Sequence, residues 1–293
     1  MIENLEGWCG SMLDKMKYVN SKGQVIEFGK KPYFIKYSDI RKYSWSYEQY
    51  QSYNRIARFN RGLSERQLPV VIVADDGEAC TAAKNRLHDV IDYDVIKKEK
   101  GKLYIGDYYI NGYFIAADQS SFLENSCTAN ITLTFCAEKS VWLKEIESEF
   151  LSATTDTGGS AVDGKFKSPP YGYPYDYMVE DSSNTIITNG SISEAAVVIV
   201  INGRAENPSV RIGLNRYEFE LTVDQGEYLI IDGLNREATL CDIAGNKSSV
   251  FGYRNKEYDL FAKVPEGNNN VSWDGSFSFS VTLYEERSEP KWI

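Results

Sequence analysis

The sequence contains few of the residues on which most catalytic and metal sites depend. Its 293 residues include a single histidine, His88, whereas a His-based zinc site needs two or three. One histidine also leaves few options for acid–base catalysis near neutral pH. Walker, Gly-x-Gly-x-x-Gly, His-Glu-x-x-His and Gly-x-Ser-x-Gly motifs do not occur in the sequence. We therefore assign no catalytic, cofactor-binding or metal-binding residue, and we expect a protein that is not an enzyme.

Cysteines and long apolar runs are also scarce. The cysteines are odd in number, widely spaced and without a Cys-x-x-Cys pair, which indicates reduced thiols rather than a disulfide framework. The longest apolar run, residues 195–201, falls well short of the ~18–20 residues that a membrane helix requires. Acidic residues near the N-terminus do not fit a signal peptide. We expect a soluble protein that is made in the cytoplasm and does not insert into membranes. The cysteines are Cys9, Cys80, Cys127, Cys136 and Cys241.

Acidic residues outnumber basic ones by 42 to 32, which gives a formal net charge of −10. This balance argues against a nucleic-acid backbone as the main partner, because the chain has no excess of cations to replace counterions. Tyrosine is abundant, with 21 copies, and several aromatic residues lie in polar surroundings. Such residues serve protein interfaces and also stack on sugar rings, and we favour interfaces. These aromatic residues are Trp45, Tyr47, Tyr50, Tyr53, Trp273 and Phe277.

Residues 1–147 are predicted to form an α+β domain of antiparallel strands with one main helix. From Asp75 to about Lys98, apolar residues recur every three or four positions, which predicts an amphipathic helix. We expect Asp75 and Asp76 to cap its start, Gly101 to follow its end, and His88 to be partly buried. The predicted apolar stripe consists of Ala79, Ala82, Ala83, Leu87, Val90, Ile91, Val95 and Ile96.

Strand patterns surround this helix. Residues 68–73 are continuously apolar and β-branched, which is typical of a buried strand. Residues 128–136 alternate, with Trp142 closing the unit. Asn111-Gly112 predicts a hairpin turn between strands 108–110 and 113–116, because both central residues of a type I′ turn need positive φ.

The remainder divides into a connector and a second domain. Residues 148–181 are rich in Tyr, Pro and Gly, which indicates an interdomain connection. Residues 182–293 contain many short strand-like runs separated by turns, which predicts an all-β sandwich. One of these runs is residues 259–263.

Three stretches together resemble the distal tail protein family of long-tailed siphophages. Residues 103–145, with a Tyr-rich hairpin, an alternating strand and an aromatic end, are similar to the end of the family's N-terminal ring domain. The Tyr-Pro-Tyr-Asp-Tyr sequence within residues 170–177 resembles its connector. The succession VVIVINGRAENPSVRI, GEYLIIDGLNREATLCDIAGN and VPEGNNNVSW within residues 189–293 resembles its galectin-like C-terminal sandwich.

The resemblance implies a structural hub without a cofactor, located in the virion tail tip of an active phage or encoded by a prophage. Family members form a hexameric ring through their N-terminal domains. That ring joins the tail tube protein to tail-tip or baseplate partners such as tail-associated lysins and receptor-binding proteins. DNA passes through its lumen without specific binding, and a negative charge suits such a conduit.

Two other hypotheses remain. In the first, the sandwich is a carbohydrate-binding module or adhesin that recognises a host cell-wall saccharide. Residues 185–293 lack histidine, however, whereas galectins use a His-Asn-Arg cluster beside a Trp. A hydrolase would need two facing carboxylates, for which only unplaced acids are available, such as Asp75-Asp76, Asp92 with Asp94, and Glu180-Asp181.

Overall fold

The computed structural model describes residues 16–35, 38–50, 53–119, 127–152 and 185–292. The chain divides into a first unit, Met1–Lys144 with Glu286–Ile293, and a second unit, Glu145–Glu285. The predicted connector lies almost entirely outside the described residues, as do its tyrosines at 171, 173, 175 and 177. The division into 1–147, 148–181 and 182–293 therefore stays a prediction.

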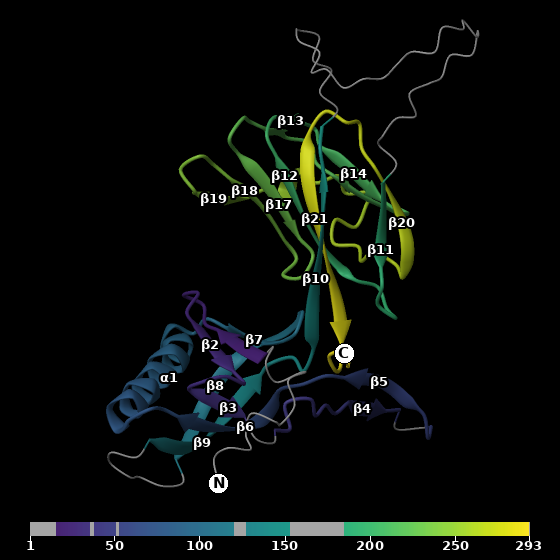
Figure 1. The fold of residues 1–293 in the computed structure, drawn as a ribbon. Coiled ribbons are helices and arrows are strands. Elements are labelled where there is room, and N and C mark those ends of the chain that lie inside the picture. The colour runs from purple at the N-terminus through teal and green to yellow at the C-terminus, as the bar shows by residue number, and fades with distance from the viewer. Residues whose placement is uncertain (1–15, 36–37, 51–52, 120–126, 153–184, 293) are drawn as a thin grey trace, which may run out of the picture. The chain divides into compact units, whose positions relative to one another are not determined.

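The described part of the first unit consists of antiparallel strands and one α-helix (Figure 1). One sheet has the order β10-β8-β7-β1-β2. Strand β8 extends past β7 to pair with β9, which pairs with β6, and β6 pairs with β3. The elements are β1 Met16–Val19, β2 Val25–Phe28, β3 Tyr33–Ile35, β4 Ser46–Gln49, β5 Ile56–Asn60, β6 Ser64–Val73, α1 Gly77–Lys97, β7 Gly101–Ile105, β8 Tyr108–Gln119, β9 Thr128–Ala137 and β10 Trp142–Phe150.

Helix α1 begins and ends where the sequence predicts, although the residue that caps its end is not a glycine. Asp76 is its N-cap, and the Asp76 carboxylate accepts a hydrogen bond from the Ala79 N–H at 2.7 Å. The helix is terminated by Lys98, which adopts the left-handed conformation with φ of 57°. Gly101 is instead the first residue of β7. The expected half-burial of His88 is confirmed.

The buried face of α1 differs in part from the predicted apolar stripe. Val95 and Ile96 are exposed, whereas the acidic residue Asp94 is fully buried. Asp94 accepts hydrogen bonds from the Tyr18 hydroxyl and from the N–H (2.8 Å) and hydroxyl (2.6 Å) of Ser21. Burial, followed by the bond to Asp94, holds the pKa of Tyr18 well above its usual value. The spacing of apolar residues could not predict the burial of Asp94, because that burial depends on hydrogen-bond partners that are distant in the sequence. The buried helix residues are Cys80, Ala83, Leu87, Val90, Ile91 and Asp94, while Ala79 and Ala82 are exposed.

The Asn111-Gly112 turn is a wrong prediction, because both residues lie inside the continuous strand β8. The actual turn lies at residues 106–107, where Gly106 has φ of 59°. A Cβ on Gly112 would lie 2.3 Å from the Cys136 carbonyl oxygen and 2.7 Å from a Phe135 ring atom. Glycine is therefore required here for the close approach of β9 and not for a turn.

Residues 286–293 complete the first unit. The Arg41 guanidinium forms an ion pair with Glu289 at 3.2 Å and donates to the Pro290 carbonyl at 2.9 Å. Its central carbon lies 3.9 Å from the centre of the Trp292 ring. Arg41, near the start of the sequence, thus contacts three residues from the last eight positions of the sequence.

The second unit is an all-β sandwich, as predicted. One sheet has the order β19-β18-β17-β12-β21-β10, and the other has the order β11-β20-β14-β15. Ile199 on β12 and Val210 on β14 contribute to a single apolar core, so the two sheets enclose it together. The strands are β11 Thr185–Asn189, β12 Ala196–Asn202, β13 Ala205–Glu206, β14 Ser209–Ile212, β15 Asn215–Glu218, β16 Thr222–Val223, β17 Tyr228–Asp232, β18 Glu237–Cys241, β19 Lys247–Ser249, β20 Gly267–Ser272 and β21 Ser278–Arg287.

The predicted strand at residues 259–263 is not formed. The chain turns there, and the Ala262 N–H donates to the Asp259 carbonyl at 3.1 Å. Leu260 and Phe261 pack into the core from this turn. Their apolar character therefore reflects burial and not strand pairing.

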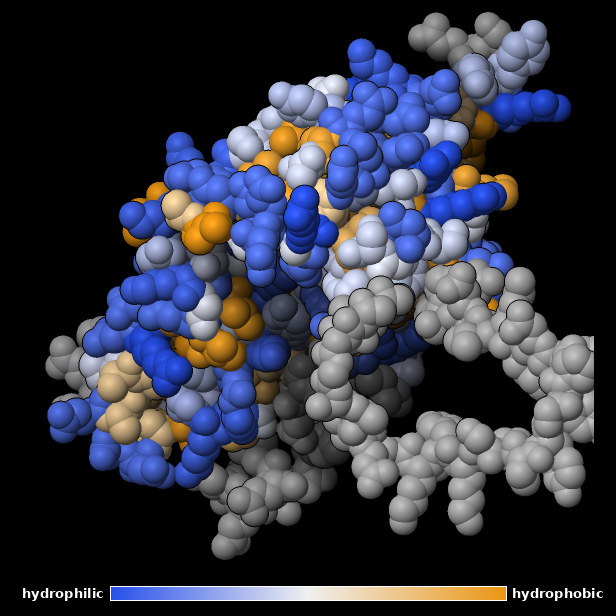
Figure 2. All heavy atoms as spheres, turned by 90° about the horizontal axis from the view of Figure 1, so that it is seen from above, coloured by the Kyte–Doolittle hydropathy of each residue, from blue (hydrophilic) through white to orange (hydrophobic). Residues whose placement is uncertain are grey.

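On the face that Figure 2 shows, hydrophilic side chains predominate and hydrophobic ones form small, separate groups. Within the described ranges, no helix is both long and apolar enough to cross a membrane. Four cysteines are free thiols, and Cys9 lies outside the described residues. The free thiols are Cys80, Cys127, Cys136 and Cys241.

Candidate interaction surfaces

Exposed aromatic side chains of the first unit are concentrated around the β4–β5 hairpin. We call residues 43–50 and 53–61 the aromatic hairpin. Tyr47 and Phe59 are opposite each other across the two strands and are 56% and 58% exposed. The predicted exposure of Trp45, Tyr50 and Tyr53 is confirmed. Both faces of the hairpin are open, because every residue of β4 and all but the last of β5 are exposed.

Contacts within the aromatic hairpin hold its shape. The Trp45 and Phe59 rings pack edge to face, with centroids 6.2 Å apart, and the Arg61 guanidinium carbon lies 4.1 Å from the Trp45 centroid. Glu48 and Arg58 form an exposed ion pair at 2.8 Å. The hydrogen bond from Arg58 holds the pKa of the Glu48 carboxyl below its usual range. The aromatic surface is therefore held in a defined arrangement before any partner binds.

The aromatic hairpin has the properties of a surface that a partner covers. Among the described strands, β4 and β5 pair only with each other, which leaves two open edges. An isolated two-stranded hairpin is only marginally stable in water, and exposed strand edges and apolar patches attract other chains. The aromatic hairpin contains three arginines and one carboxylate, a net charge of +2 in a chain whose net charge is −10. The hairpin is thus suited to an acidic partner surface, such as that of a second copy.

The second unit has a groove of about 560 Å³ on the face of the β11-β20-β14-β15 sheet that points away from the core. Ser209 and Arg211 on β14 line this groove and alternate with the buried residues Val210 and Ile212. Arg216 on β15 also lines it. The remaining lining residues come from the ends and loops of the sheet, and they are Leu214, Tyr258, Ser272, Trp273 and Asp274.

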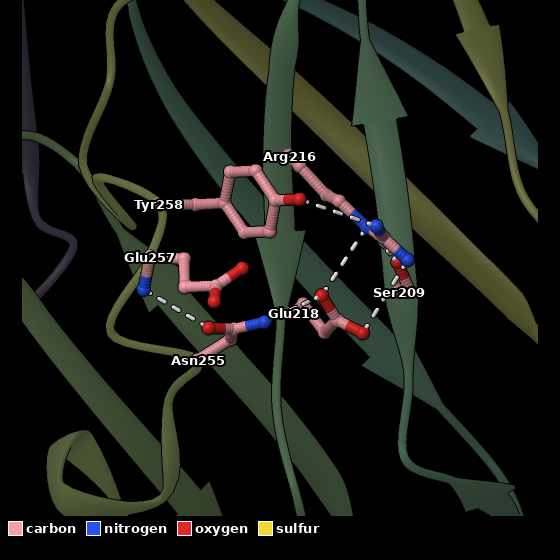
Figure 3. Close-up of polar contacts among 6 residues, drawn as sticks. All are labelled: Ser209, Arg216, Glu218, Asn255, Glu257 and Tyr258. Atoms are coloured by element: carbon pink, nitrogen blue, oxygen red, sulfur yellow. Dashed lines mark hydrogen bonds and ion pairs between the residues drawn. The ribbon is translucent and has the colours of Figure 1, made fainter.

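Arg216 is the centre of a polar network beside this groove (Figure 3). Its Nε donates to the Ser209 hydroxyl at 3.2 Å and pairs with the Glu218 carboxylate at 3.2 Å. Its Nη1 donates to the Tyr258 hydroxyl at 3.5 Å. Asn255 donates to Glu218 at 3.1 Å, which connects the loop that carries Tyr258 to β15. The hydrogen bond to Tyr258, more than the nearby Glu218 carboxylate, raises the pKa of the Arg216 guanidinium above its usual value.

The two aromatic residues predicted to be exposed in the second unit differ in their environment. Trp273 is half-buried and lines the groove, and its indole N–H donates to the Phe277 carbonyl at 3.0 Å. Phe277 is buried in the core, so its predicted exposure is wrong. The arrangement of Arg211, Arg216 and Tyr258 could not be predicted, because these residues come from separate strands and a loop.

The Tyr-rich segment 104–113 and the acidic pairs have different environments. Tyr108 and Tyr109 are buried in the first unit, so they are not available to a neighbour. Asp76 caps α1 and Asp94 is buried, while Glu180-Asp181 lies outside the described residues. In the ranges that the structure describes, no three His, Cys, Asp or Glu side chains are close enough together to hold a metal ion.

The fold is that of the hub and baseplate proteins of phage tails. The SPP1 Dit (gp 19.1) protein, described as a paradigm of hub adsorption apparatus in Gram-positive infecting phages, is similar over 93% of this chain and 99% of its own. The TM-score is 0.57 and the sequence identity 10%. A chain from the structure of the phage P2 baseplate in its activated conformation with Ca is similar over 94% of this chain and 99% of its own, with a TM-score of 0.60 and 11% identity. The Sr form gives a TM-score of 0.60 and 10% identity.

No protein-family model and no curated protein matches the sequence. The resemblance to distal tail proteins that the sequence indicates is confirmed by the fold, at a sequence identity of 10% to the SPP1 Dit protein and 11% to the P2 baseplate chain. The likeness covers nearly the whole of the Dit chain, so both units take part in it.

Proposed function

We propose that this protein is the distal tail protein of a siphophage, a structural hub that joins the tail tube to the tail-tip or baseplate and host-adhesion apparatus. The fold supports this role, because the similarity to the SPP1 Dit protein extends over 93% of the chain. The role needs no cofactor and no catalytic residue. A structural role is consistent with a sequence that contains none of the catalytic motifs considered above.

The aromatic hairpin is the observation that carries the assembly part of this proposal. Its exposed Tyr47 and Phe59 lie on a two-stranded sheet with open edges, in a basic segment of an acidic chain. We infer that it binds a different surface of a neighbouring copy. Such a head-to-tail contact repeats around an axis and closes into a ring when the rotation permits. The first unit is the ring-forming domain in this proposal.

The finer features of the proposal follow from the distal tail resemblance. The ring is a hexamer, and the second unit is its galectin-like sandwich. The tail tube protein binds on one side, and tail-associated lysins or receptor-binding proteins bind on the other. DNA passes through the lumen, where the chain's excess of carboxylates repels phosphate. The protein is made in the bacterial cytoplasm, encoded by an active phage or a prophage, and is located in the tail tip.

Light scattering on the purified chain, over a range of concentrations, tests the assembly. We expect a mass roughly sixfold above the 33.2 kDa of the chain, and rings with sixfold symmetry in negatively stained electron micrographs. A strict monomer at the highest concentration would contradict the proposal. As the main role of the protein, a carbohydrate-binding module or adhesin is not better supported than a hub, since the structural neighbours are hub and baseplate proteins.

A further inference from the structure

The groove of the second unit contains a pair of arginines that the fold itself does not explain. Arg211 and Arg216 are directly opposite each other in the β14–β15 pairing. Like charges at directly opposite positions destabilise a pair of strands. Both side chains are exposed and both line the groove, so their placement costs stability at a site that is open to a ligand.

The two arginines differ in how they are held. Arg216 is fixed by Glu218, Ser209 and Tyr258, as Figure 3 shows. Arg211 donates from Nε to the Gly213 carbonyl at 3.1 Å and forms no ion pair with any described carboxylate. The terminal nitrogens of Arg211 are therefore available to donate hydrogen bonds into the groove.

Two aromatic residues lie at the same groove. Tyr258 is 36% exposed, and its ring centre lies 5.4 Å from the Arg216 guanidinium carbon. Trp273 is held from behind by edge-to-face contacts with Phe150 and Phe279, at centroid distances of 5.7 and 5.1 Å. Its indole N–H is already used within the fold. Trp273 therefore offers a fixed apolar surface instead of a hydrogen bond.

The groove also contains acceptors that balance its donors. Asp274 lines it, and its Oδ1 accepts from the N–H and hydroxyl of Ser276 at 3.0 and 2.7 Å. The second Asp274 oxygen has no hydrogen-bond partner in the described part of the chain, so it can accept from a ligand. Two guanidiniums thus lie near three carboxylates, those of Asp274 in the groove and of Glu218 and Glu257 beside Arg216, so the site has no excess of positive charge.

We propose that this groove binds a neutral saccharide ring. A saccharide has an apolar C–H face and a rim of hydroxyl groups, each of which both donates and accepts hydrogen bonds. Tyr258 and Trp273 provide the apolar surface, while Arg211 and the free Asp274 oxygen provide a donor and an acceptor. The lack of excess positive charge disfavours a phosphate or carboxylate ligand, which would need an excess of cations. The network around Arg216 fixes the site in advance, which reduces the entropy that binding costs.

Binding of the full chain to an array of defined glycans tests this inference. The array should include neutral glycans built from glucose, galactose, rhamnose and N-acetylglucosamine, and acidic ones built from galacturonic acid. We expect retention on at least one neutral glycan, followed by its titration in solution by tryptophan fluorescence. Inorganic phosphate, added as a competitor, should not displace the glycan.

Two substitutions at the groove and one outside it identify the site. Arg211→Gln removes the charged donors, and Tyr258→Ala removes an aromatic face. Each should weaken binding about tenfold, which corresponds to about 1.4 kcal/mol. Arg211→Gln loses a hydrogen bond from a charged group, and Tyr258→Ala loses an apolar contact surface. Arg204→Gln, at an exposed arginine in the turn after β12, should bind like the wild type. Equal melting temperatures would show that all three variants are folded.

Several outcomes would overturn the inference. These are no retention on any neutral glycan, retention only on acidic glycans, displacement by phosphate, or equal binding by the Arg211 and Arg204 variants. The inference does not depend on the proposed assembly. Light scattering on the same Arg211→Gln sample should give the wild-type mass, so a failure of sugar binding and a failure of ring formation are separately visible.

Discussion

Replacing Tyr47 and Tyr53 of the aromatic hairpin by serine should weaken self-association without unfolding the protomer. The two side chains are 56% and 72% exposed, and in the described structure neither makes a hydrogen bond or a ring contact. The substitutions therefore remove little from the fold of a single copy. The substitutions should therefore lower the affinity between copies and leave the stability of each copy unchanged.

The magnitude follows from the area that a neighbour would cover. A buried aromatic side chain removes about 150–250 Å² from water, so covering these exposed fractions would bury roughly 250 Å² in all. At about 25 cal/mol per Å², the upper limit is about 6 kcal/mol per contact. Ordering of side chains and loss of free motion reduce this value, and we expect about 3 kcal/mol, or a roughly hundredfold weaker contact.

Light scattering across a dilution series measures this change directly. The double variant should dissociate at much higher concentration than the wild type, while urea denaturation of the dissociated chain should be unchanged. Ile192→Ser is the matched control, since Ile192 is 85% exposed but lies in a loop of the second unit. If the double variant associates as tightly as this control, the hairpin is not the contact and the reasoning is wrong.

Three further sets of substitutions test the fold, each by urea denaturation. Gly112→Ala should lower the free energy of unfolding by about 1–3 kcal/mol, because the added Cβ would overlap β9. Gly62→Ala is the control and should change the free energy of unfolding little, because a Cβ at Gly62 would meet no atom. Equal values for the two variants would contradict the packing argument. Asp76→Ala should cost about 1 kcal/mol as an N-cap, and more than Asp75→Ala, whose ion pair is exposed. Burial and nearby carboxylates raise the pKa of Tyr284 to about 12, so above pH 10 the unfolded chain loses this proton first. Stability should therefore fall as the pH rises from 10 toward 12, and Tyr284→Phe should reduce that slope; an unchanged slope would show that Tyr284 ionises alike in both states.

Local patterns in the sequence predict those elements whose stability is mainly local or whose two faces differ. The alternation of polar and apolar residues in 128–136 predicts β9, in which every second residue, the apolar one, is buried. The N-cap of α1 is predicted because the capping carboxylate and its backbone donor are three residues apart. The exposure of the aromatic hairpin is predicted by the polar neighbours of Trp45, Tyr47, Tyr50 and Tyr53.

Predictions fail where distant segments decide the outcome. The Asn111-Gly112 pair matches a turn, but the fit of Gly112 against Phe135 and Cys136 places it within a strand. Asp94 is buried through Tyr18 and Ser21, which are more than 70 positions away. The groove likewise depends on register, since only the β14–β15 pairing brings Arg211 opposite Arg216. No local pattern contains that information.

The contacts of Arg41 with Glu289, Pro290 and Trp292 affect the order in which the two units are completed during synthesis. The ribosome delivers residues 286–293 only after the whole second unit, so a nascent chain carries its aromatic hairpin for a long time without the segment that completes the first unit. The second unit, continuous from residue 145 to 285, can fold in the meantime. The first unit is therefore completed only after the second unit has been synthesised.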